Sequence, residues 1–288
     1  VQALALGDTR GLDDRDWEVL RATGLTHLIA ISGFHVGLVA GFGALLARLA
    51  WWLWPSLGWR WPRPQGVAAA ALLMALAYTA LAGFALPTVR TALMIGAVAL
   101  ARMLRRPQGT GRSLALATIA VLVFDPLSVL SPGFWLSYLG VAWLLWCLPS
   151  GPGQGWLRPY LGAQGVASLG LLPVGAWFFA QASIPGPLVN LVGIPWISLG
   201  VVPLALAGLG LQPLWPQAAA AAWRAAAGLM DALWAGLEWV AAWPSALAWL
   251  PEPSLAAVVL ALAGVFWLLL PRAVPGKALA LLLLLPLL

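Results

Sequence analysis

Charged side chains are scarce in this sequence. The 288 residues include 15 Lys and Arg and 9 Asp and Glu, so only 8% of the chain is charged, whereas soluble domains carry about 25%. No charged residue occurs between Arg158 and Arg224, a stretch with room for about three bilayer spans. A water-soluble enzyme or DNA-binding domain is therefore excluded, and so is disorder, because 62% of the chain is hydrophobic and its net charge is only +6.

Cysteine and histidine are almost absent as well. Cys147 is the only cysteine, so no disulfide can form within the chain, and His27 and His35 are the only histidines. We therefore expect no metal site built from clustered histidines and cysteines, and no cofactor. The sequence also contains no P-loop and no paired catalytic carboxylates, so it predicts a protein that is not an enzyme and that does not hydrolyse ATP.

Residues 1–26 form the only hydrophilic stretch and hold five of the nine acids. Asp13 and Asp14 predict the start of a short helix, with Arg21 near its end and Gly24 stopping it, an order of charges that suits the helix dipole. We expect a short amphipathic, extracytoplasmic helix at the membrane edge. Because the chain begins without Met and ends in an apolar run, we expect it to be a piece of a longer protein.

The remaining chain, residues 27–288, predicts an all-α, multi-span integral membrane helical bundle with about 8–10 spans. The 113–124 segment is expected to run on to Leu130, and Gly and Pro residues in 188–211 predict a broken or re-entrant segment. Tryptophans gather near segment ends, as in interfacial belts. The apolar segments are 27–54, 66–86, 88–104, 113–124, 134–148, 161–180, 188–211, 217–242, 255–270 and 278–288.

Basic residues predict the orientation of these spans. Ten of the fifteen cations lie in four loops that fall on one side if the spans alternate from an outside N-terminal end, and the positive-inside rule makes that side cytoplasmic. If the 217–242 helix does not span the membrane, the last of these loops falls on the opposite side. The ten cations are Arg48, Arg60, Arg63, Arg102, Arg105, Arg106, Arg112, Arg158, Arg272 and Lys277.

The first span combines small and polar residues. Gly33, Gly37 and Gly41 recur every four residues and predict a groove in which another helix packs closely. Ser32 and His35 lie on the opposite face, where they could bond to a neighbouring helix, line a hydrated path, or form a hydrolase dyad. Their placement on one helix, with no acid to orient the imidazole, disfavours the dyad.

A second polar cluster follows a predicted break in the chain. Gly83 and Pro87 separate two apolar segments, and Arg90 falls in the first turn of the next one. An arginine there either extends its side chain to the membrane interface or contacts phosphate at the mouth of a cavity. The second alternative is chemically favourable because the planar guanidinium group can donate two hydrogen bonds to a phosphate.

Later segments add further polar residues. Ser137 and Tyr138 lie on the span that follows a tight outer loop, and Asn190 lies beside a predicted helix break, where it is expected to bond to freed backbone groups. Arg224, Asp231 and Glu238 are spaced by seven and share one face of the 217–242 helix. That helix either lies along the membrane surface or presents its charged stripe to a wet cavity.

These clusters together resemble the ComEC family of DNA-uptake channel proteins, specifically the multi-span competence domain. The most specific match is the run from His27 to Gly41, which reads HLIAISGFHVGLVAG. The other matches are Gly7-Asp8, the run from Pro87 to Met94, Asp125-Pro126 through Ser137-Tyr138, and Asn190 with Pro195 and Pro203.

The resemblance implies a channel that passes single-stranded DNA across the bacterial cytoplasmic membrane during natural transformation. The implied path residues are Arg90, His35, Ser32, His27, Asn190, Ser137 and Tyr138. The implied partners are single-stranded DNA, the lipid bilayer, other DNA-uptake machinery, and OB-like and metallo-β-lactamase-like domains that are absent from this chain. A small-molecule or lipid transporter of the same helical class would share the composition, and an intramembrane hydrolase is the enzymatic alternative.

Overall fold

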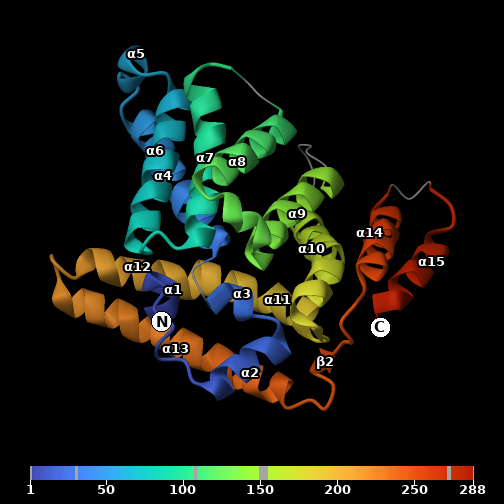
Figure 1. Ribbon diagram of the computed structural model, residues 1–288. Helices are drawn as coiled ribbons and strands as arrows, with labels where there is room; N and C mark the ends of the chain where they lie inside the picture. The colour runs from blue at the N-terminus through green and yellow to red at the C-terminus, as the bar shows by residue number, and fades with distance from the viewer. Residues whose placement is uncertain (1, 30–31, 107–108, 149–154, 271–273, 288) are drawn as a thin grey trace. The chain divides into compact units, whose positions relative to one another are not determined.

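The computed structural model describes residues 2–29, 32–106, 109–148, 155–270 and 274–287, and helices make up most of it (Figure 1). The chain divides into two compact units. The first comprises Val1–Leu12, His27–Ser128 and Pro195–Ala232, and the second comprises Asp13–Thr26, Val129–Ile194 and Leu233–Leu288. The long helix α13 (Pro216–Ala241) runs from the first unit into the second.

Three long helices dominate the first unit, namely α4 (Gly33–Leu53), α6 (Arg63–Leu81) and α7 (Leu86–Met103). They lie side by side in Figure 1, and each packs on the other two. Their shared core contains Val36, Val39, Ala75 and Tyr78. The remaining elements of this part of the chain are α1 (Gln2–Leu6), α3 (Thr26–Ile29), α5 (Leu57–Arg60), α8 (Thr110–Phe124) and the 3-10 helix η1 (Pro126–Leu130).

The close approach of α4 to α6 depends on Gly43. A Cβ added at Gly43 would lie 2.9 Å from the Ala70 carbonyl oxygen and 2.5 Å from Cγ of Met74. The backbones therefore meet at a distance that only glycine permits, which is a common way to pack helices in membranes.

The predicted break in 188–211 takes the form of a widened turn within one helical run. α11 (Gly186–Pro195) continues through the π-helical turn η2 (Trp196–Val201) into α12 (Val202–Leu211). π-turns of this kind often accompany functional sites. In the first unit, α13 follows α12, with the Trp223 indole donating to the Ala205 carbonyl oxygen at 3.1 Å.

The second unit is built around α9 (Pro132–Cys147), α10 (Leu157–Phe179) and α14 (Leu255–Leu269). α10 packs on both other helices, and α14 also packs on the 3-10 helix η3 (Leu281–Leu287), which follows α15 (Lys277–Ala280). Short strands β1 (Gln181–Ser183) and β2 (Leu247–Trp249) pair antiparallel, with Gln181 opposite Trp249.

The short hydrophilic helix predicted near the N-terminus is confirmed as α2 (Asp14–Thr23). Asp13 and Asp16 form a capping box, in which each side chain accepts a hydrogen bond from the other residue's backbone N–H, at 2.8 and 3.1 Å. Gly24 ends the helix with a φ of +73°, and a Cβ there would lie 3.0 Å from the Gly186 Cα. Glycine is thus required both for the turn and for the packing.

The predicted all-α membrane bundle is confirmed, since five described helices are long and apolar enough to cross a bilayer. These five are Gly33–Leu53, Arg63–Leu81, Leu86–Met103, Leu157–Phe179 and Gly186–Leu211. Four shorter apolar helices accompany them, and α13 is not among the five helices that could span the membrane. The predicted extension of the 113–124 segment to Leu130 is wrong, because α8 ends at Phe124 and the separate 3-10 helix η1 covers Pro126–Leu130.

Candidate functional site

Buried polar side chains gather at one end of the α4, α6 and α7 group, where α4 and α7 begin and α6 ends. We call this the polar end and define it by Ser32, His35, Thr79, Thr88 and Arg90. His35 and Thr88 are fully buried, Thr79 is 2% exposed and Arg90 is 5% exposed. Polar and ionisable side chains inside a membrane bundle are costly to bury and usually mark functional paths.

A tight turn between α6 and α7 positions Arg90. Gly83 and Phe84 both adopt left-handed backbone conformations, with φ of +64° and +56°. α7 then begins at Leu86 with Pro87 in its first turn, a position that proline favours. Arg90 is the fifth residue of α7, one position beyond the first turn that the sequence predicted.

Ser32 and His35 are linked through the start of α4. The backbone N–H of Ser32 donates to Nδ1 of His35 at 3.3 Å, and the His35 backbone N–H donates to the Ser32 carbonyl oxygen at 3.1 Å. With Nδ1 acting as acceptor, a neutral imidazole carries its proton on Nε2. Among the described residues, Nε2 is buried and has no hydrogen-bond partner. This geometry differs from a hydrolase dyad, in which the serine hydroxyl itself bonds to the imidazole.

The first turns of α4 and α7 are in contact at the polar end. This contact is expected if Ser32, His35 and Arg90 belong to one site. A Cβ added at Gly33 would lie 2.1 Å from Oγ1 of Thr91, whose hydroxyl donates to the Pro87 carbonyl oxygen at 3.1 Å. The start of α4, with Ser32 and His35, therefore lies against the first turns of α7, which carry Arg90.

The predicted glycine groove of α4 requires a correction. Gly33 packs closely, but a Cβ added at Gly37 or Gly41 would meet no atom within 4 Å, and both glycines are exposed. The four-residue spacing identified one helix face correctly, yet the rest of the first unit does not cover most of that face. The close contact of α4 with α6 is made at Gly43 instead.

α1 and α12 lie against this end of the helix group. The Tyr78 hydroxyl donates to the Leu4 carbonyl oxygen in α1 at 3.2 Å, and Leu206 of α12 packs on the core formed by α4 and α6. Figure 1 shows α12 crossing the helix ends rather than running along them. The first unit therefore encloses its buried polar side chains beneath a crossing helix.

The other predicted path residues lie on α3, α9 and α11, outside the polar end as defined above. His27 is exposed on α3 of the first unit. Ser137 and Tyr138 lie on α9 in the second unit, where the Tyr138 ring packs on Phe134 with centroids 4.7 Å apart. Asn190 lies on α11, and its expected role is not observed, because its buried Oδ1 accepts no hydrogen bond from the described residues.

The charged stripe predicted on 217–242 is present on α13. Arg224, Asp231 and Glu238 are all exposed, and Glu238 lies 3.8 Å from Arg15 of α2 in the second unit. The buried face of the same helix carries Ala226 and Leu237. α13 therefore carries three exposed charged residues together with buried apolar ones.

An exposed ion pair belongs to the hydrophilic N-terminal stretch. Arg10 donates from Nε and Nη2 to the two carboxylate oxygens of Asp8 at 2.9 and 2.8 Å. These hydrogen bonds lower the pKa of Asp8 to about 2. Among the described residues, no group of three or more His, Cys, Asp and Glu side chains is placed to hold a metal ion.

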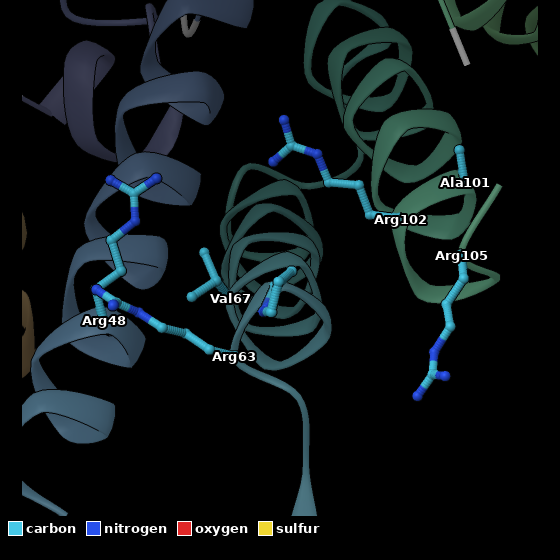
Figure 2. Close-up of a pocket in the computed structure, with 7 residues that line it drawn as sticks. Arg48, Arg63, Val67, Ala101, Arg102 and Arg105 are labelled. Carbon is cyan, nitrogen blue, oxygen red and sulfur yellow. The ribbon is translucent and has the colours of Figure 1, made fainter. Parts of the chain in front are cut away.

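The opposite end of the α4, α6 and α7 group is basic. A pocket of about 450 Å³ lies there, lined by Arg48, Arg63, Pro64, Val67, Ala101, Arg102 and Arg105 (Figure 2). The sequence had indicated these arginines only as markers of orientation. Their positions at adjoining ends of consecutive antiparallel helices were the signal that could have predicted a shared pocket.

Comparisons with known proteins agree on one family. The Competence protein family profile matches residues 4–275. The chain is 40% identical over 99% of its length to Competence protein ComA of Neisseria gonorrhoeae, and it covers 40% of that protein. It is 33% identical to Recombination protein 2 of Haemophilus influenzae and 30% identical to ComE operon protein 3 of Bacillus subtilis. These matches cover 71% and 74% of the chain but only 27% and 26% of the two proteins.

The chain thus spans two fifths or less of the length of these relatives. No solved structure matches it. The family profile covers nearly the whole chain, including both the polar end and the basic pocket, and the five long apolar helices make the chain a membrane protein. It belongs to the Competence protein family.

Proposed function

We propose that this chain is the membrane part of a DNA-uptake protein and passes single-stranded DNA across the cytoplasmic membrane during natural transformation. Membership of the Competence protein family supports this role, as does the name of the relative ComA. The proposal makes the chain a conduit and not an enzyme. OB-like and metallo-β-lactamase-like domains and other uptake machinery would then act beside it.

The buried arginine at the polar end is the observation that carries the proposal. Arg90 is 5% exposed within a membrane helix, where an arginine that faced lipid would cost at least about 2.5 kcal/mol on insertion scales. Its planar guanidinium can donate two parallel hydrogen bonds to a phosphate. A single fixed charge attracts the DNA backbone without holding it, which a transit path requires.

The surrounding polar groups complete the proposed path. The His35 imidazole offers a buried Nε2 donor, and Thr88 and Thr79 add hydroxyls at the same end of the helices. Ser32 and the exposed His27 extend the path at the start of α4. On α9 and α11, Ser137, Tyr138 and Asn190 would offer hydroxyl, aromatic and amide surfaces to the strand, and bases can stack on the aromatic one.

The proposed orientation places residues 1–26 outside the cytoplasmic membrane. In that orientation the polar end faces the incoming strand and the arginine-lined pocket faces the cytoplasm, as the positive-inside rule favours.

Replacement of Arg90 tests the proposed function. Arg90→Ala should reduce transformation by at least about a hundredfold, because removal of an interaction with a charged phosphate costs about 1.5–3 kcal/mol per bond and two bonds are lost. Arg90→Lys should retain part of the activity, because it keeps the charge without the fork. Transformation frequency and the amount of protein in the membrane would be measured together.

The matched control is Arg112→Ala, which removes an exposed arginine from α8 in the same unit. It should leave transformation within about twofold of the wild type, because an exposed cation contributes little. Full transformation by Arg90→Ala would contradict the proposal. Loss of the Arg90→Ala protein from the membrane would assign the residue to folding instead.

A further inference from the structure

The basic pocket at the far end of α4, α6 and α7 has a mixed lining. Arg48 comes from α4, Arg63 from the start of α6 and Arg102 from the end of α7, and Arg105 lies two residues beyond that end. Figure 2 shows Arg63 extending towards Arg48 and Arg102 reaching in from α7, while Arg105 points away. Between them lies an apolar wall of Pro64, Val67 and Ala101, of which Val67 is 7% and Ala101 is 8% exposed.

The positive charge of this pocket is not neutralised by the protein. The sequence contains no Asp or Glu between Glu18 and Asp125, so α4, α6 and α7 carry no acid at all. Within the described residues, none of the four pocket arginines forms an ion pair. Cations that line one cavity repel one another, and an anion bound between them would relieve that repulsion.

The lining favours a lipid phosphate over a nucleic-acid phosphate. Sites for single-stranded nucleic acid combine cations with aromatic side chains on which bases stack, and no aromatic side chain is found among the described residues that line this pocket. The apolar wall instead suits the glycerol and upper acyl carbons of a phospholipid. Exposed tryptophans at the same end of the helices, Trp52 at 73% and Trp61 at 58%, are typical of the membrane interface.

We propose that this pocket binds an anionic phospholipid of the cardiolipin class, whose headgroup carries two phosphates. Arginines from three helices can contact two phosphates at once, and basic pockets between transmembrane helices on the cytoplasmic side bind such headgroups. The lipid would join the ends of α4, α6 and α7 by bonding to arginines from all three helices. This site goes beyond the DNA path and is independent of it.

The pocket is tested on the full chain in detergent by native mass spectrometry during titration with cardiolipin. The double variant R63Q/R102Q should bind cardiolipin about 25-fold more weakly, since each arginine near an anionic headgroup contributes about fivefold. The charge-matched control R112Q/R158Q removes two exposed arginines outside the pocket, and its affinity should stay within about twofold of the wild type. R63K/R102K should fall between them, because lysine keeps the charge without the fork.

Two competitors distinguish the source of the phosphate. Inorganic phosphate should not displace cardiolipin, because it offers nothing to the apolar wall, and an oligothymidine should bind equally to the wild type and to R63Q/R102Q. If the double variant does not fold by circular dichroism, the single variants R63Q and R102Q should each bind about fivefold more weakly. Equal loss in R112Q/R158Q, displacement by phosphate, or selective loss of oligothymidine binding in R63Q/R102Q would each overturn the proposal.

Discussion

The two ends of the α4, α6 and α7 group use arginine in opposite ways. At the polar end, Arg90 is 5% exposed, and His35, Thr79 and Thr88 are buried at the same end of the helices. At the basic end, Arg48, Arg63, Arg102 and Arg105 are all exposed and surround an open pocket. About 27 Å of helix separates the two ends of α7, given a rise of about 1.5 Å for each of its residues.

This difference shows that the position of an arginine along a span governs what it can do. Near a span's end, an arginine keeps its hydration, costs little and sets orientation. Inside the packed group, the same side chain loses its hydration. The free-energy cost of that loss must be offset by hydrogen bonds or ion pairs with fixed partners, or with a ligand. The buried arginine therefore points to selective contact, and the exposed ones point to attachment at the membrane surface.

The prediction with the largest expected effect concerns the side of the membrane that the polar end and the basic end each face. In a Cys147→Ser background, a cysteine at Gln2 should react with a membrane-impermeant thiol reagent in intact cells. A cysteine at Gly109, beside the basic end of α7, should react only after the cells are opened. The measurement is the labelled fraction of each variant before and after lysis.

Labelling at Gly109 and not at Gln2 in intact cells would reverse the orientation. The polar end would then face the cytoplasm, and the four arginines would contradict the positive-inside rule. Exposure of both positions on one side of the membrane would contradict the alternation of spans on which the orientation rests.

A smaller effect is expected from two glycines, Gly33 and Gly37, that have the same predicted role in the sequence but different surroundings in the structure. Gly33→Ala should destabilise the protein by about 1–3 kcal/mol, the usual cost of overpacking, because the new methyl group would collide with Thr91 at the polar end. Gly37→Ala should be neutral or stabilising by up to about 1 kcal/mol, because it improves helix propensity and meets no atom within 4 Å.

The free energy of unfolding of both variants would be measured in detergent, with circular dichroism as the signal. Gly33→Ala should also reduce transformation, since it displaces the start of α4 from the turns that carry Arg90. Equal stability of the two variants would show that α4 does not depend on this contact. A strong loss in Gly37→Ala would mean that another surface covers the exposed part of the groove.

Features with local causes were predictable from the sequence. The capping residues Asp13 and Asp16 and the stop at Gly24 define α2 within a few residues of chain, and the break at Gly83 and Pro87 needs only backbone preferences. The α-helical membrane class follows from long uncharged segments. In each case, the interaction that determines the structure lies within the segment itself.

Features that depend on packing were not predictable to the same degree. Spacing identified the face shared by Gly33 and Gly37, but only the fold reveals that Thr91 lies against the first and nothing lies against the second. The same holds for Arg48 and Arg102, which line one pocket because α4 and α7 are neighbours that run in the same direction. One sequence does not specify which helices become neighbours, so it predicted Ser32, His35 and Arg90 of the polar end but not the threonines beside them, and it did not predict the basic pocket.

We propose that DNA contacts the polar end and that lipid contacts the basic end. Two exposed leucines at the two ends of α7 allow a direct comparison, namely Leu86, which is 50% exposed, and Leu104, which is 60% exposed. A photoreactive amino acid placed at either position in the full chain should report its neighbours when cells are irradiated during uptake of labelled DNA. We expect labelled DNA to crosslink to position 86 and phospholipid to position 104. DNA crosslinking at position 104 and not at position 86 would contradict the account.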